Sequence, residues 1–147
     1  MAEVEFRPII PADIAYIKST FLRSHRNSAF TKLIPNKEYF DFFSPLFDSI
    51  LEEDNIIAAL AVNPEDSNHI YGWCAWEKIG PIQVLHYTYT KVAYRNFGIA
   101  LQLLDATGFN VEQPFFYTFA SGASSKLRKK FKQAVYNPFI NLTAKER

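Results

Sequence analysis

Three apolar stretches follow one another in the middle of the chain and constrain its fold more than any other feature. They cover residues 56–62, 70–77 and 82–90, and each has the length and composition of a β-strand. A turn-rich break at residues 63–68 separates the first two, and Gly80-Pro81 separates the last two. Because connections this short join antiparallel neighbours, we expect a three-stranded antiparallel meander.

The segments on either side of the meander predict further strands and helices. We expect strands at residues 4–8, 115–119 and 135–140, and helices opening at residues 11–13 and covering residues 36–51, 98–107 and 124–132. A meander followed by a β-α-β unit gives a mixed, mostly antiparallel sheet flanked by helices, an α/β fold. Pro45 is expected to break or kink its helix, with Ser44 capping a new start.

The length and composition favour one domain over residues 1–147. An apolar content of 48% supplies a core, and a net charge of +1 gives no general attraction to nucleic acid or an anionic membrane. A single cysteine, Cys74, excludes an internal disulfide and a cysteine-based zinc site, and we expect no metal. Without a signal-like N-terminus or an apolar run of about 20 residues, we expect a cytoplasmic protein.

Residues 91–104, KVAYRNFGIALQLL, change from β-like to helical character around Gly98. At the start of a helix, successive backbone N–H groups have no partner within the helix, and the helix dipole adds to their attraction for anions. The stretch therefore predicts an anion site, such as one for a pyrophosphate, which Gly98 would let come close to the backbone. The alternative is that a strand-to-helix connection simply needs a small residue.

Arg95-x-x-Gly98-x-Ala100 resembles the Q/R-x-x-G-x-G/A signature of the GNAT superfamily of N-acetyltransferases, which binds the pyrophosphate of acetyl-CoA. Residues 6–8, Phe-Arg-Pro, and Asp13 at the start of the first helix are similar to the opening strand and helix of that family. The expected order of elements matches the family over nearly the whole chain. The resemblance therefore implies a GNAT-like fold that binds acetyl-CoA.

The resemblance also implies where acetyl-CoA lies. A V-shaped slot would open between the strands at residues 82–90 and 115–119, and the pantetheine arm would pair with backbone like an added strand. The amides of residues 97–100 would hold the pyrophosphate. The cofactor-binding residues implied are Thr90, Lys91, Val92, Arg95, Asn96, Phe97, Gly98, Ile99 and Ala100.

Acetyl transfer to an amine needs a base that accepts a proton from the amine. The position at which family members often carry a Glu falls near Val84, which cannot serve. His86, two residues further on and expected on the same face, is a candidate base or water-relay partner, and Glu77 is the second choice. The alternatives are a hydrogen-bonded histidine in an aromatic cluster and a solvated glutamate at a strand end.

An acid that returns a proton to the leaving thiolate is the second requirement. The tyrosine that many family members carry in the last helix corresponds to Arg128, which is no proton donor at neutral pH. Tyr117, across the slot, or Tyr136 are candidate substitutes, and the alternative is that both are packed aromatics. The short tail after Ile140 predicts a truncated final hairpin.

Three functions are compatible with these features. The first is an acetyl-CoA-dependent N-acetyltransferase acting on a primary amine of a small molecule or a protein. The second is a GNAT-like protein that has lost its chemistry and binds or inhibits a partner; the small, compact form resembles acetyltransferase-like proteins of phages and mobile elements. The third is a nucleic-acid-associated protein that uses the basic side chains of residues 126–132. The other interpretations of these side chains are a solvated surface and contacts with the cofactor's 3′-phosphate.

Aromatic residues at positions 39–47 also have two interpretations. Tyr39, Phe40, Phe43 and Phe47 either line the acceptor slot or belong to the core, which is the commoner place for such residues. Composition alone does not separate the two, because binding pockets are themselves largely apolar.

Overall fold

The computed structural model describes residues 3–28, 31–95 and 98–142. Its elements follow the order β1 (Glu5–Pro8), a 3-10 turn (Pro11–Asp13), α1 (Ile14–Arg26), α2 (Asn36–Leu51), β2 (Ile57–Asn63), β3 (Asp66–Ile79), β4 (Ile82–Thr90), a second 3-10 turn (Val92–Tyr94), α3 (Ile99–Ala106), β5 (Phe115–Tyr117), α4 (Gly122–Lys130), β6 (Ala134–Tyr136) and α5 (Phe139–Leu142). Apart from α5 and the 3-10 turns, this is the expected order. Within the described ranges, no helix combines the length and apolarity needed to cross a membrane.

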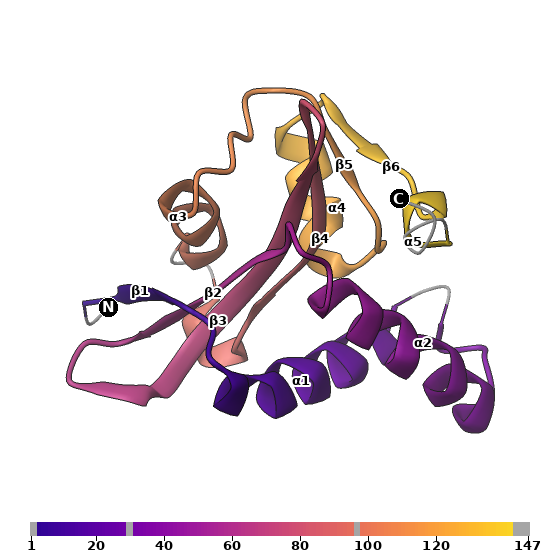
Figure 1. The fold of residues 1–147 in the computed structure, drawn as a ribbon, viewed down its shortest axis with the longest axis horizontal. Helices are drawn as coiled ribbons and strands as arrows, with labels where there is room; N and C mark the ends of the chain where they lie inside the picture. Colours follow the sequence, from indigo (N-terminus) through magenta and orange to yellow (C-terminus); the bar gives the residue numbers. More distant parts are fainter. Residues whose placement is uncertain (1–2, 29–30, 96–97, 143–147) are drawn as a thin grey trace.

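The strands form one six-stranded sheet in the order β1-β2-β3-β4-β5-β6 (Figure 1). The first four strands pair antiparallel, so the expected meander is confirmed. β5 and β6 join it in parallel, after the crossovers that contain α3 and α4. The mixed, mostly antiparallel sheet predicted from the sequence is therefore confirmed.

Helices cover both faces of the sheet, and the alternation along β2 shows how. Ala58, Leu60 and Val62 are buried in a cluster with α1 and α2, whereas Ala59 and Ala61 are buried in a second cluster with α3 and α4. Side chains of a strand point alternately to its two faces, so one apolar strand serves both cores. The apolar residues of α3 that contribute to the second cluster are Ile99, Leu103 and Leu104, all nearly inaccessible.

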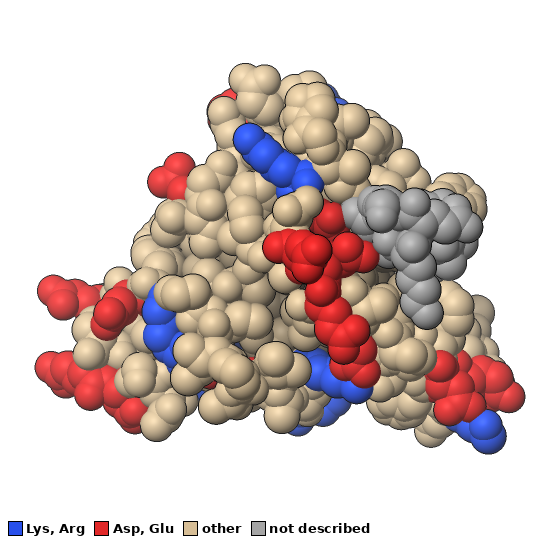
Figure 2. Space-filling model, viewed as in Figure 1, with Lys and Arg blue, Asp and Glu red and all other residues tan. Residues whose placement is uncertain are grey.

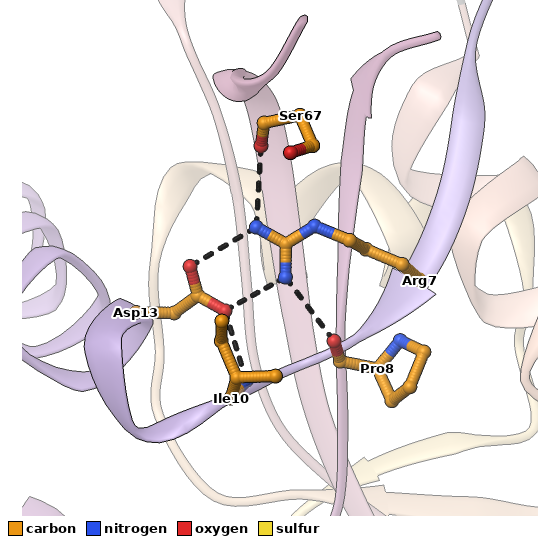
Figure 3. Close-up of polar contacts among 5 residues, drawn as sticks. All are labelled: Arg7, Pro8, Ile10, Asp13 and Ser67. Carbon is orange, nitrogen blue, oxygen red and sulfur yellow. Dashed lines mark hydrogen bonds and ion pairs between the residues drawn. The ribbon is translucent and has the colours of Figure 1, made fainter.

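A salt bridge joins the first strand to the first helical segment (Figure 3). The Arg7 guanidinium donates to both carboxylate oxygens of Asp13, over 2.8 and 3.1 Å, and also to the backbone oxygen of Ser67 at the start of β3. Asp13 accepts a further bond from the backbone N–H of Ile10 (2.9 Å). The bond from Arg7 lowers the pKa of Asp13, so the pair stays ionised and fixes the entry to α1.

Two expected elements differ from the structure. α2 does not break at Pro45, because Phe47 and Ile50 beyond it are fully buried, and their packing offsets the hydrogen bond that proline removes. The last strand ends at Tyr136 and α5 follows, where a strand over residues 135–140 was expected. Pro138 has no N–H for a sheet ladder, and the Asn137 side chain accepts the N–H of Phe139 at the start of the helix.

Candidate functional site

β4 and β5 pair only at their beginnings and then diverge. Their register covers three residue pairs, the last being Leu85 with Tyr117, and the N–H of Thr118 donates to the oxygen of Leu85 (3.1 Å). Beyond this point the later part of β4 lines a cavity of about 550 Å³. The sheet is therefore open beside β4, but the slot is not bounded by the strand expected at residues 115–119: β5 ends at Tyr117, and α4 forms the wall facing β4.

The cavity wall comes from four parts of the chain that are distant in sequence. Those parts are the end of α1, the second half of β4, the start of α3 with the loop before it, and α4. Their lining residues are Ser24, Asn27 and Ser28; Tyr87, Thr88, Tyr89 and Thr90; Tyr94, Arg95, Gly98, Ile99, Ala100 and Leu101; and Ser121, Gly122, Ala123, Lys126, Leu127 and Lys130.

Five of the residues that the sequence assigned to the cofactor line this cavity, namely Thr90, Arg95, Gly98, Ile99 and Ala100. Lys91 and Val92 do not line it. The N–H of Lys91 donates to Tyr71 on β3 (2.9 Å) and its oxygen accepts from Tyr94 (2.9 Å), so its backbone groups are already used within the protein. Asn96 and Phe97 lie outside the described residues.

The start of α3 has the features expected of an anion site. Gly98 is the N-cap residue, with φ of 74°, in the left-handed region that favours glycine, and no side chain caps the helix. Its oxygen accepts the first helical bond, from the N–H of Gln102 (3.0 Å). The N–H groups of Ile99 and Ala100 therefore belong to the first turn of a helix, where no intrahelical acceptor exists, and both residues line the cavity.

The N-terminus of α4 lies on the same cavity. Ser121 caps it by accepting from the N–H of Ser124 (3.2 Å), and the Ser124 hydroxyl accepts in return from the N–H of Ser121 (2.7 Å). Lys126 and Lys130, four residues apart, line the cavity, as does Arg95. Two helix N-termini and three cations thus converge on one space, an arrangement that attracts anions.

The edge of β4 presents backbone groups to the cavity. The oxygen of Thr90 accepts from Nε of Arg95 (2.9 Å), away from β3, whereas the next residue, Lys91, bonds to β3. Because successive residues of an antiparallel strand direct their backbone groups to opposite sides, Thr88 and Thr90 direct theirs toward the cavity. An extended ligand is able to pair with such an edge as an added strand.

The candidate bases His86 and Glu77 form a buried hydrogen-bonded pair. Nε2 of His86 lies 2.6 Å from Oε2 of Glu77, and Nδ1 lies 2.9 Å from the hydroxyl of Thr118. His86 is 1% exposed and Glu77 2%, so the interpretation of Glu77 as a solvated strand end is wrong. Buried carboxylates need partners, and here the partner is the imidazole.

His86 occupies a β-bulge. Opposite β4, Trp76 pairs with Leu85 and Ala75 pairs with Tyr87, so His86 is the extra residue between two pairs. The bulge interrupts the alternation on which we assigned His86 to the face of Val84. Sequence reasoning found the residue but not the local geometry that carries it.

A small chamber connects the buried pair to the larger cavity. It has a volume of about 10 Å³ and is lined by both His86 and Tyr117. Its other lining residues include four that also line the larger cavity, namely Tyr87, Thr88, Ser121 and Leu127. The volume is close to what one water molecule needs. The three catalytic candidates thus lie together at the base of the slot, with Glu77 behind His86.

The aromatic residues of α2 do not line the cavity. Tyr39 and Phe47 are fully buried, and the Tyr39 hydroxyl donates to the backbone oxygen of Leu22 (2.7 Å), so the core interpretation holds for both. Phe40 is 44% exposed. Within residues 3–28, 31–95 and 98–142, no three His, Cys, Asp or Glu side chains group closely enough to hold a metal ion.

Several lining residues were missed by sequence reasoning. Ser24 lies in the last turn of α1, and Asn27 and Ser28 follow that helix. They come near β4 only because α1 packs on the sheet. Ser24 and Tyr87, 63 positions apart, are joined by a hydroxyl–hydroxyl bond of 2.7 Å. No local sequence pattern predicts such a contact. Thr118 had a weak signal, because it lies within the strand expected at residues 115–119.

No family model matches the sequence, and no curated protein matches it either. Solved structures do match. One of them, a predicted acetyltransferase from Clostridium acetobutylicum with acetyl-CoA, has a TM-score of 0.60 at 19% identity over 88% of this chain and 88% of that one. The chain has the GNAT acetyltransferase fold.

Two further solved structures match over similar shares of the chain. A ribosomal-protein-alanine N-acetyltransferase from Brucella melitensis has a TM-score of 0.53 at 15% identity, over 89% of this chain and 88% of that one. An integron cassette protein from the mobile metagenome of V. cholerae has a TM-score of 0.54 at 15% identity, over 90% and 84%. At these identities the likeness is one of fold.

Proposed function

We propose that the chain is an acetyl-CoA-dependent N-acetyltransferase that transfers acetyl to a primary amine by direct attack. The observation that carries this proposal is the convergence of two helix N-termini and three cations on a cavity bordered by the edge of β4. Coenzyme A combines a pyrophosphate and a 3′-phosphate with an extended, amide-bearing arm. Those are the groups that such a site binds.

The cofactor takes the following place in this proposal. The pyrophosphate binds the N–H groups of Ile99 and Ala100 beside Gly98. The pantetheine arm pairs with the backbone of Thr88 and with the N–H of Thr90, whose oxygen accepts from Arg95. Lys126 and Lys130 reach the 3′-phosphate. The acetyl-CoA of the Clostridium structure, which shares the fold, supports this choice of ligand.

The chemical step needs proton acceptance from the amine, and the chain Thr118–His86–Glu77 supports a role for His86 in it. With the Nε2 proton donated to Glu77, Nδ1 is the basic nitrogen. The Thr118 hydroxyl accepts a proton from the amine while its own proton passes to Nδ1 of His86, which lines the small chamber. Glu77 then stabilises the imidazolium by its charge.

In the transfer step the amine nitrogen attacks the thioester carbonyl, a C–N bond forms, and the C–S bond breaks to release coenzyme A thiolate. Tyr117, which lines the same chamber, is the candidate that returns a proton to the thiolate. Because holding amine and thioester together supplies much of the acceleration, ordinary acid and base groups suffice.

Binding is tested at Gly98, with Gly108 as a matched control. Both have positive φ, 74° and 94°, and no atom lies within 3.4 Å of a Cβ added at either, so Gly98→Glu and Gly108→Glu impose similar backbone strain. Only the carboxylate introduced by Gly98→Glu would meet the pyrophosphate. Thermal unfolding with saturating acetyl-CoA should show a clear stabilisation, about 2.7 kcal/mol at 100 times Kd, in the wild type and Gly108→Glu but not in Gly98→Glu.

Catalysis is tested at Thr118, because His86→Ala removes the imidazole that is hydrogen-bonded to the buried Glu77 and endangers folding. Thr118→Val keeps the shape and removes the hydroxyl, whereas Thr118→Ser retains it. Thiol release should fall about 100-fold in Thr118→Val and much less in Thr118→Ser, with acetyl-CoA stabilisation unchanged in both. Equal turnover in all three proteins would remove His86 from the mechanism.

The alternative of a binding protein without catalysis predicts a different result. Acetyl-CoA would stabilise the wild type, but no amine would produce thiol release. The single domain over residues 1–147, the cytoplasmic location and an origin in a mobile element stay predictions, the last favoured by the integron cassette structure that shares the fold.

A further inference from the structure

The end of α1 forms a part of the cavity wall that the cofactor does not use in the proposed arrangement. Ser24, Asn27 and Ser28 line the cavity there, and Ser24 is hydrogen-bonded to the hydroxyl of Tyr87. Because these residues contribute neither a helix N-terminus nor a cation, they are suited to the acceptor rather than to phosphate groups.

The charges of the cavity limit which acceptors it takes. Among its lining residues that the structure describes, Arg95, Lys126 and Lys130 are charged, and none is Asp or Glu. Glu77 is buried behind His86. A second or third ammonium group of an acceptor would therefore find no carboxylate partner in the described wall, which is unfavourable.

Acidic side chains gather elsewhere on the surface. Figure 2 shows them at the junction of α2 with β2 and around the β2–β3 turn. Glu52 and Asp54 follow α2, and Glu65 and Asp66 form the turn; all four are exposed and none lines the cavity. The chain thus carries carboxylates, but they are outside the site.

Hydroxyl groups dominate the remaining polar lining. Ser24, Ser28, Tyr87 and Tyr89 carry hydroxyls, and Asn27 adds an amide with both a donor and an acceptor.

From these observations, and resting on the transferase function proposed above, we infer that the acceptor is a small polyhydroxylated monoamine of the amino-sugar class. Its hydroxyls bind Ser24, Asn27 and Ser28, and its single amine points to the thioester. Polyamines and polycationic aminoglycosides are disfavoured because the described wall gives their additional charges no partner.

The test compares four acceptors at equal concentration in a thiol-release assay with acetyl-CoA. They are glucosamine, spermidine, an aminoglycoside, and an uncharged peptide with a free N-terminus. We expect kcat/KM for glucosamine to exceed that for each of the others at least tenfold. Preferred turnover of spermidine, the aminoglycoside or the peptide would overturn the inference and leave the transferase function standing.

A different result would contradict the proposed function itself. If acetyl-CoA neither stabilises the protein nor releases thiol with any acceptor, both the transferase function and this inference are wrong. Stabilisation without thiol release for any of the four acceptors identifies a binding protein, and it also overturns the inference.

A charge variant tests the wall itself. Asn27→Asp changes the charge of a lining residue with almost no change of shape, and Asn55→Asp makes the same change at an exposed residue outside the cavity. The ratio of kcat/KM for spermidine to that for glucosamine should rise about three- to tenfold in Asn27→Asp, less so at high salt. An unchanged ratio there, or an equal rise in Asn55→Asp, would exclude the end of α1 as the acceptor wall.

Discussion

A buried histidine at the end of α1 makes the stability of the fold depend on pH. His25 is 5% exposed, and its ring centroid lies 5.3 Å from that of Phe21, 4.9 Å from Phe43 and 5.1 Å from Phe119. Its Nδ1 has no hydrogen-bond partner within the described part of the chain. Burial among these rings disfavours the imidazolium and lowers the pKa of His25 to about 4.

The magnitude follows from proton linkage. In the unfolded chain the pKa of histidine is about 6.5. As the pH falls below 6.5 the unfolded state binds a proton that folded His25 does not bind, so stability present above 6.5 is lost progressively down to pH 4. A difference of roughly 2.5 pKa units corresponds to about 3 kcal/mol in total, and about 2 kcal/mol of it is lost between pH 7 and pH 4.5.

The assay is urea unfolding at pH 7 and pH 4.5 for the wild type and for His25→Phe. Phenylalanine suits the aromatic surroundings and does not titrate, so the variant keeps every other pH-dependent contribution. The wild type should lose about 2 kcal/mol more than the variant between the two pH values. Equal losses would refute the reasoning, because they would mean that His25 becomes protonated in the folded state as easily as in the unfolded one.

Two further substitutions test the close approach of β3 to β4 and the charge of the cavity lining. Gly72→Ala places a Cβ 2.4 Å from the backbone oxygen of Tyr89, so it should destabilise the protein by about 1–3 kcal/mol in urea unfolding, whereas Gly122→Ala, with nothing within 4 Å, should not. Lys126→Gln removes a cation that lines the cavity and should weaken acetyl-CoA binding about three- to tenfold at low salt in isothermal titration. Lys129→Gln, on the same helix but outside the lining, should bind as the wild type does; equal effects of both lysines would instead indicate a general surface field.

The parts of the fold that the sequence predicted are those with local signals. Turn residues at positions 63–68 and 80–81 mark the meander, and each turn joins strands that are neighbours in the sheet. The start of α3 at Gly98 was predicted for a similar reason: Gly98 has a backbone conformation that glycine adopts more easily than other residues. Pro45 misled the prediction because burial of the following turn, a tertiary effect, outweighs a local one.

The site was predicted less completely, for physical reasons. Gly98 was correctly placed on the cavity because it belongs to the signature, and Thr90 because it lies just before it. Lys91 was assigned with them, but its N–H bonds to β3. The contributions of α1 depend on packing across the sheet, and the pairing of His86 with Glu77 depends on a bulge. A bulge adds one residue to one strand, and no residue type in this stretch requires it.

That one extra residue has a consequence for everything downstream of it in β4. Side chains and backbone groups of a strand repeat every two residues, so removing any single residue between His86 and Thr90 would turn the rest of the strand over. The tyrosine rings would exchange faces with the threonines, and the amides and carbonyls now directed at the slot would be directed at β3. A length change of one residue here would present the backbone groups of other residues at the strand edge, whereas changes in the β2–β3 turn would leave the present set in place.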